Sequence, residues 1–270
     1  MVSWQGVSQG AAAILGALSG LLLSRLMDPQ ALASWGWRLP FLVGLLIAPV
    51  GIYIRRQLPE RHDGDTAQAH ASPIRSLVTQ HTKPLATAVL LILSQTVTMY
   101  VVVYFMPSYL NRVMHYPAST GFMAAIASSL TIAIASFVGG RIADRTFRRK
   151  PLVLATTTLG LVLCLPAFWV LVHVPNVYAV VAVCATMTAL MGLGGIAITV
   201  LIMEMFPPSV RASGFSIAYA VAVTLFGGTA QFVTTSLIVK TGSPLAAGYY
   251  VFACLVVSWV TLLRLRERTA

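Results

Sequence analysis

The sequence predicts an all-α membrane protein in which several helices span the bilayer. Apolar residues make up 57% of the 270 residues and charged residues only 9%, whereas a soluble domain carries roughly a quarter charged residues. The net charge is +11, but the charged residues gather in the breaks between long apolar runs, which argues against a nucleic-acid partner. Each run approaches or exceeds the ~20 residues needed to cross the hydrocarbon core of a membrane.

Eight spans follow one another along the chain: 6–27, 37–54, 84–109, 118–138, 151–172, 178–203, 212–239 and 245–263. With the breaks assigned alternately to the two membrane surfaces, one surface receives fourteen Lys and Arg residues and the other four. Because cytoplasmic loops retain Lys and Arg, we expect both termini in the cytoplasm.

Cysteine and histidine placement argues against a chemical centre. The three cysteines lie inside apolar runs without metal-ligand spacing, and no histidine lies in the middle of a run. No disulfide framework, metal site or nucleophile–base pair is therefore expected, and neither is an enzymatic activity.

The densest cluster of charge is the short break 139–150, with the sequence GGRIADRTFRRK. This pattern resembles the signature loop of the major facilitator superfamily, found between helices 2 and 3 or helices 8 and 9. The alternative is an ordinary basic cytoplasmic loop, but such a loop requires neither Gly140 nor the adjacent Asp144 and Arg145. With Arg148 and Arg149, these residues form a candidate cytoplasmic gate motif.

The resemblance implies a major facilitator fold in which this chain supplies helices 5–12 of a 12-helix transporter, lacking roughly the first four helices. Residues 1–55 would be the last two helices of the N-terminal bundle and 56–83 a cytoplasmic linker. Residues 84–264 would form the C-terminal six-helix bundle, and 265–270 a cytoplasmic tail. Within the linker, Ile74, Leu77 and Val78 share the spacing of a short helix on the membrane surface.

A second signature identifies a branch. The string WGWRLPF at 35–41, followed by Arg55-Arg56 and Leu58-Pro59-Glu60, resembles the metabolite:proton symporters, which carry citrate, 2-oxoglutarate, shikimate or proline and betaine. The resemblance implies proton-coupled symport of a small organic acid, citrate-like in the first instance, across the bacterial inner membrane by alternating access.

The implied partners are the organic acid, the proton and membrane lipid, with no cofactor beyond the coupling proton and a monomeric state at full length. Proline/betaine carriage is the rival substrate class. A truncated, non-transporting remnant or assembly partner is a further alternative.

Polar side chains in the first span are candidates for a substrate cavity. Gln5, Ser8 and Gln9 stand at i, i+3 and i+4 and so share one helical face. In lipid such a face must look into protein or water, and hydrogen bonding between helices is the alternative role. The segment resembles the start of helix 5 in citrate symporters, where the matching glutamine and serine line the cavity.

Later spans add further candidates. In the span 84–109, Gln95, Tyr100 and Tyr104 are polar, and the two tyrosines are four residues apart. Citrate-type carriers show a similar tyrosine pair in helix 7, and phenol hydroxyls can donate to a carboxylate. Tyr219 belongs to a stretch that resembles helix 11 of these carriers, with core packing as an equal alternative.

Glu204 and Arg211 flank a proline-containing turn that resembles the family's helix 10–11 connection. A carboxylate at a helix end is costly if unpaired, and we expect Arg145 or Arg211 to pair with Glu204. The hypothesis is an inner gate in which Asp144, Arg145 and Glu204 hold the outward-open state together.

The position of the acidic residues limits what this segment can do. None of the seven acidic residues lies at the middle of a span, although a proton-coupled carrier needs a titratable group in its path. We expect that carboxylate, and the main anion-binding arginine, in the helices that this segment lacks. Gly192, Gly194 and Gly195 are expected to permit a bend in the span 178–203.

Overall fold

The computed structural model describes residues 3–57, 77, 79–146 and 149–265, all within helices or the short connections between them. Eight helical segments in this part of the chain are long and apolar enough to cross a membrane, and they correspond one by one to the predicted spans. Their ends differ from the predicted ends by a few residues. The gate residue Arg148, most of the predicted linker, and Ile74 and Val78 of the surface helix lie outside the described residues.

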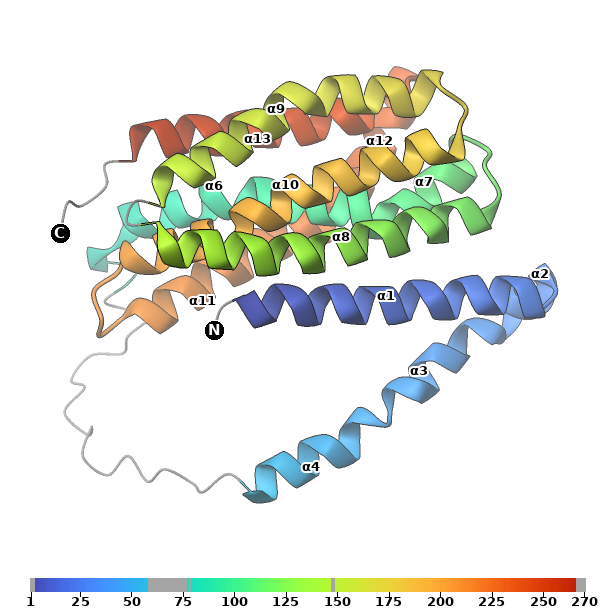
Figure 1. The fold of residues 1–270 in the computed structure, drawn as a ribbon, viewed down its shortest axis with the longest axis horizontal. Coiled ribbons are helices and arrows are strands. Elements are labelled where there is room, and N and C mark those ends of the chain that lie inside the picture. The colour runs from blue at the N-terminus through green and yellow to red at the C-terminus, as the bar shows by residue number, and fades with distance from the viewer. Residues whose placement is uncertain (1–2, 58–76, 78, 147–148, 266–270) are drawn as a thin grey trace.

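Six spans form a bundle (Figure 1). The first comprises α6 (Thr82–Thr98), η2 (Met99–Phe105) and α7 (Met106–Arg112). Then follow α8 (Ala118–Arg145), α9 (Lys150–His173) and α10 (Val177–Glu204). The fifth comprises α11 (Arg211–Ala222), η3 (Val223–Gly227) and α12 (Gly228–Thr241), and the sixth is α13 (Ala246–Arg264). We call the end of the bundle at which α8 finishes and α9 begins the charged end.

Glycines let the helices at the centre of the bundle approach closely. A Cβ on Gly139 of α8 would lie 2.4 Å from the backbone oxygen of Leu193 in α10, and a Cβ on Gly192 would lie 2.8 Å from Cβ of Ala135. The helix α10 runs unbroken through Gly192, Gly194 and Gly195. Gly192 and Gly194 therefore allow close helix packing, whereas a Cβ on Gly195 would meet only Oε1 of Gln95, at 3.6 Å. That α10 bends at these glycines stays a prediction.

Two spans contain π-helical segments, which the apolar pattern did not predict. They are η2 and η3, each inserted between two α-helical parts of one span. Pro107 is the second residue of α7 and lies two residues after the end of η2. Because proline has no backbone N–H, the normal i→i−4 bond cannot form there, which favours a change of helical register just before it.

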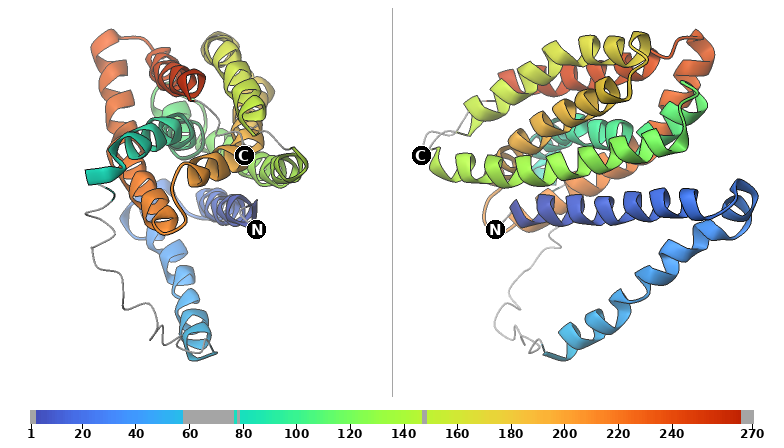
Figure 2. Two further views of the ribbon diagram at one scale, coloured as in Figure 1. Left: turned by 90° about the vertical axis from the view of Figure 1, so that its left-hand side faces the viewer. Right: turned by 45° about the vertical axis from the view of Figure 1, so that its right-hand side comes forward.

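The first span, α1 (Ser3–Leu26), packs antiparallel along α8 (Figures 1 and 2). Gly10 meets Ser129 and Ala133, whereas Gly20 meets the ring of Phe122. The α1 N-terminus lies at the charged end, the same end at which α8 finishes (Figure 1).

The second span extends away from the bundle (Figures 1 and 2). After α2 (Pro29–Ser34) and η1 (Gly36–Arg38), it is divided into α3 (Leu39–Gly44) and α4 (Ile47–Gln57). Pro49 cannot donate to the carbonyl of Leu45, which accounts for the break between α3 and α4. Residues 41–57 are exposed throughout, so this span presents its apolar side chains outward.

Leu77, the described member of the predicted surface helix, is fully buried. It belongs to the core cluster that includes Leu91, Val153, Ile202 and Phe206. Leu77 therefore packs into the bundle rather than onto a membrane surface, because the apolar side chains of this cluster surround it.

Candidate functional site

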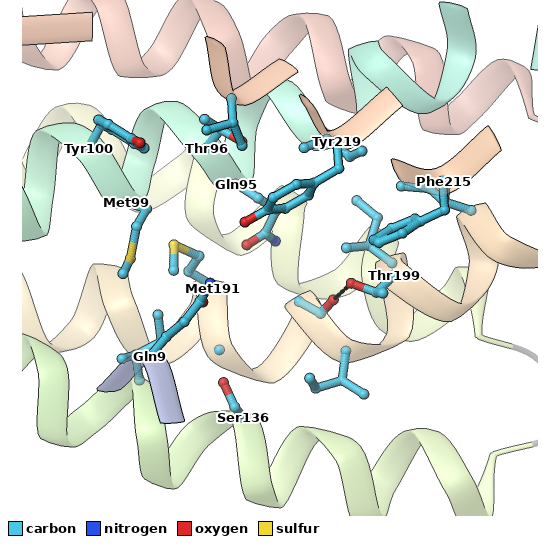
Figure 3. A pocket seen from close by; sticks show the side chains of 18 of the residues that line it. Gln9, Gln95, Thr96, Met99, Tyr100, Ser136, Met191, Thr199, Phe215 and Tyr219 are labelled. Carbon is cyan, nitrogen blue, oxygen red and sulfur yellow. Dashed lines mark hydrogen bonds between the residues drawn. The ribbon is translucent and has the colours of Figure 1, made fainter. Parts of the chain in front are cut away.

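A cavity of about 240 Å³ lies between α1, the first bundle span, α8, α10 and the fifth bundle span. Figure 3 shows its side chains, which come from all five of these spans. The polar lining residues are Gln9, Gln95, Thr96, Tyr100, Tyr104, Ser136, Thr199 and Tyr219. Charged side chains are absent from the described lining, so the chemistry available here is that of amides, phenols and hydroxyls.

Five of the seven predicted cavity residues meet at this cavity: Gln9, Gln95, Tyr100, Tyr104 and Tyr219. Ser8 is exposed and is not part of the described lining. The side chain of Gln5 lies outside the described residues, although its backbone belongs to α1. That these residues bind substrate stays a prediction.

The aromatic residues are arranged in two pairs. The rings of Tyr100 and Tyr104 meet edge to face with centroids 5.3 Å apart. The rings of Phe215 and Tyr219 are stacked with centroids 5.9 Å apart. Each pair supplies ring surface and at least one phenol hydroxyl, which can donate to an oxyanion or accept from an ammonium group.

Gln95 has a central place at this cavity. Its side chain and that of Tyr219 project into the cavity from different spans (Figure 3). Among the described residues, the Gln95 carboxamide has no hydrogen-bond partner, so both its N–H donors and its oxygen are available to a ligand or to water.

Some lining residues were not identified from the sequence. Ser136 and Thr199 look like ordinary packing residues in an apolar run, and the hydroxyl of Thr199 donates to the carbonyl of Gly195 at 2.8 Å. Met99 and Met191 carry no polar signal. Only the packing of η2, α8 and α10 against one another brings these residues to the cavity.

A second, smaller cavity of about 30 Å³ lies behind Gln95. Ser94, Thr98, Thr156 and Thr157 contribute hydroxyls to its lining, and Gln95 lines both cavities. A polar space of this size is sufficient for a water molecule.

At the charged end, the structure corrects the expected partner of Glu204. Its carboxylate forms an ion pair with Arg149, not with Arg145 or Arg211. Arg211 instead donates through Nε to the carbonyl of Phe206 at 3.4 Å. The reason is geometric, because α9 begins beside the end of α10 and brings Arg149 next to Glu204.

The other predicted gate residues also lie at the end of α8. Gly140 is buried, whereas Asp144 and Arg145 are exposed. Lys150 donates to the carbonyl of Leu265 and so ties the start of α9 to the end of α13. Whether these groups form a gate stays a prediction.

Comparison with known proteins gives a family. The model of the family described as Major Facilitator Superfamily matches residues 1–229 and 120–270. The chain is similar to the citrate-proton symporter of Klebsiella pneumoniae, with 30% identity over 275 residues, 99% of this chain and 61% of that protein. The citrate-proton symporter of Salmonella typhi is 28% identical over 92% of this chain and 57% of its own length.

A second kind of relative carries a different name. The proline/betaine transporter of Escherichia coli K12 is 28% identical over 283 residues, 99% of this chain and 55% of that protein. The chain thus spans between 55% and 61% of the length of these three relatives.

Proposed function

The chain belongs to the major facilitator superfamily, and from this membership we propose that it is the larger part of a secondary transporter. The proposed activity is proton-coupled symport of a small organic acid, with citrate or a related tri- or dicarboxylate as substrate. Transport would take place across the bacterial inner membrane by alternating access. No enzymatic step is involved, and the relatives are named as symporters and transporters.

The observation that carries this proposal is the composition of the large cavity. Gln95 and Tyr104 of the first bundle span and Tyr219 of the fifth offer amide and phenol donors to one space. A carboxylate in such a space can accept several hydrogen bonds, and hydrogen bonds to charged groups contribute about 1.5–3 kcal/mol each. A citrate-proton symporter is 30% identical to nearly the whole chain, which supports the same substrate class.

A zwitterionic osmolyte of the proline/betaine type is the second candidate. Four aromatic residues line the cavity: Tyr100, Tyr104, Phe215 and Tyr219. Aromatic faces attract quaternary ammonium groups through cation–π interactions, and a proline/betaine transporter is 28% identical to this chain.

The predicted arrangement in the membrane is part of the proposal. Both termini would lie in the cytoplasm, with residues 1–55 completing an N-terminal bundle and residues 84–264 forming the C-terminal bundle. The charged end would then be cytoplasmic, where Asp144, Arg145 and Glu204 would act as the inner gate, with Arg149 as the partner of Glu204.

Uptake by the full-length product of the native gene tests the proposal, once its intact mass has been measured. In proteoliposomes with an inwardly directed proton gradient, we expect uptake of labelled citrate that excess dicarboxylate reduces and glycine betaine does not. Uptake of betaine instead of citrate would show that the substrate belongs to the second class, the zwitterionic osmolytes. Gradient-dependent uptake of neither compound would overturn it.

A matched pair of variants tests the cavity itself. Tyr104→Phe removes one phenol hydroxyl from the cavity, and the loss of a hydrogen bond to a carboxylate should raise KM for citrate about 10- to 100-fold. Tyr249→Phe is the control, because Tyr249 lies on α13 with 55% of its side chain exposed. Equal KM values for the two variants would remove Tyr104 from the binding site.

A further inference from the structure

The two π-helical segments of the bundle both border the large cavity. Met99, Tyr100 and Tyr104 of η2 line the cavity, and so does Val223 of η3. A π-helical turn is wider than an α-helical turn and is frequent at functional sites. Among the described spans, the two that contain π-helical turns therefore both contribute to the wall of the cavity.

One close contact between the two spans is made at Gly227, the last residue of η3. A Cβ at Gly227 would lie 2.7 Å from Cγ2 of Thr96 and 2.8 Å from Cε2 of Tyr100. Real Cβ atoms do not approach other heavy atoms this closely, so Thr96 and the Tyr100 ring occupy space that any other residue at 227 would fill.

The neighbouring glycine has no such role. A Cβ at Gly228 would meet only the carbonyl oxygen of Val223, at an ordinary contact distance of 3.9 Å. Gly227 is buried and Gly228 is exposed. Gly227 and Gly228 are adjacent in the sequence, but a side chain would be crowded only at Gly227.

The residues that Gly227 accommodates are cavity residues. Thr96 and Tyr100 both line the cavity, and the Tyr100 ring in turn meets Tyr104 edge to face. A side chain at 227 would press on the Tyr100 ring from behind. Because Tyr100 lines the cavity, a shift of its ring changes the shape of that lining.

We propose that Gly227 is a positioning residue that sets how far Tyr100 reaches into the cavity and thereby determines which substrates fit. It acts through Tyr100 and does not itself touch the substrate. The proposal rests on the transport function proposed above, and its geometric part can be tested without transport.

Thiol labelling tests the geometry in the purified full-length protein. The three cysteines of this chain are buried, so labelling by a hydrophilic maleimide above that of the parent protein reports on the Tyr104→Cys variant. Adding Gly227→Ala should push the Tyr100 ring over residue 104 and slow labelling severalfold, whereas adding Gly228→Ala should leave the rate unchanged. Equal rates in the two backgrounds would overturn the proposal, whether or not citrate is transported.

Transport kinetics test the consequence for substrate choice. Misplacement of a positioning contact by ~1 Å can cost up to about 100-fold, and Gly227→Ala should raise KM and alter the ratio of citrate to dicarboxylate uptake. Gly228→Ala should preserve both quantities. A Gly227→Ala variant with less folded protein but unchanged KM and selectivity would show that Gly227 serves packing alone, and would also overturn the proposal.

Discussion

At the scale of single residues, glycine decides how closely the helices of this bundle approach. Gly139 and Gly16 illustrate the range. A Cβ on Gly139 would lie within 3 Å of three backbone atoms of Leu193, whereas a Cβ on Gly16 would meet no atom within 4 Å. Backbone atoms cannot rotate away as a side chain can, so a substitution at Gly139 must separate α8 from α10.

We therefore expect Gly139→Ala to destabilise the protein by about 1–3 kcal/mol, the usual cost of overpacking a core. Gly16→Ala should be neutral or slightly stabilising, because alanine favours a helix and has room there. The melting temperatures of the two variants are compared in detergent, with unfolding monitored by thiol-reactive fluorescence or size-exclusion chromatography. Equal melting temperatures would mean that α8 and α10 do not pack as closely as described.

The sequence predicted some of the cavity residues and could not predict others, for a physical reason. Tyr100 and Tyr104 are polar aromatics at helical spacing in an apolar run, and such residues need a polar or aqueous environment. Ser136 and Thr199 can satisfy their hydroxyls on their own helix, as Thr199 does with Gly195. Their sequence context therefore carries no sign of a cavity.

At the scale of elements, apolar runs predict where a helix spans but not its internal hydrogen bonding. All eight spans were predicted, yet two contain π-helical turns and one is split into α3 and α4. Hydropathy reports the environment of side chains, whereas the register of backbone hydrogen bonds depends on prolines and on contacts between spans, such as that of Gly227 with Tyr100.

The ion pair between Arg149 and Glu204 joins two elements at the charged end, and its exposure allows gating to be separated from folding. The two side chains are 28% and 48% exposed, so water screens the pair and its contribution to stability should stay below about 1 kcal/mol. We expect Glu204→Gln and Asp144→Asn to keep the melting temperature and to change the rate of uptake severalfold.

The control for these gate variants is Asp28→Asn, which removes an exposed carboxylate at the other end of α1. It should leave uptake as in the wild type. Unchanged uptake in Asp144→Asn and Glu204→Gln would refute the inner gate. A large loss of stability in either variant would show that the carboxylate holds the bundle together instead.

At the scale of the whole molecule, the basic residues sort onto the two ends of the bundle. Arg145 and Arg264 lie in the last turns of α8 and α13 at the charged end, where Arg149 and Lys150 begin α9. Arg112 and Lys240 lie in the last turns of α7 and α12 at the opposite end. The positive-inside rule counts such residues near the ends of spans. The fold thus places at one end of the bundle the basic residues that the sequence analysis assigned to one membrane surface.

This distribution predicts that the charged end faces the cytoplasm. His115, between α7 and α8, and Ser209, between α10 and α11, are both exposed and lie at opposite ends of the bundle. In intact spheroplasts, a membrane-impermeant maleimide should label His115→Cys and should reach Ser209→Cys only after the membrane is permeabilised. The three cysteines of this chain are buried, and labelling of the parent protein gives the background. The opposite labelling pattern would invert the molecule in the membrane and place the Arg149–Glu204 pair on the outer surface, where it could not form the inner gate.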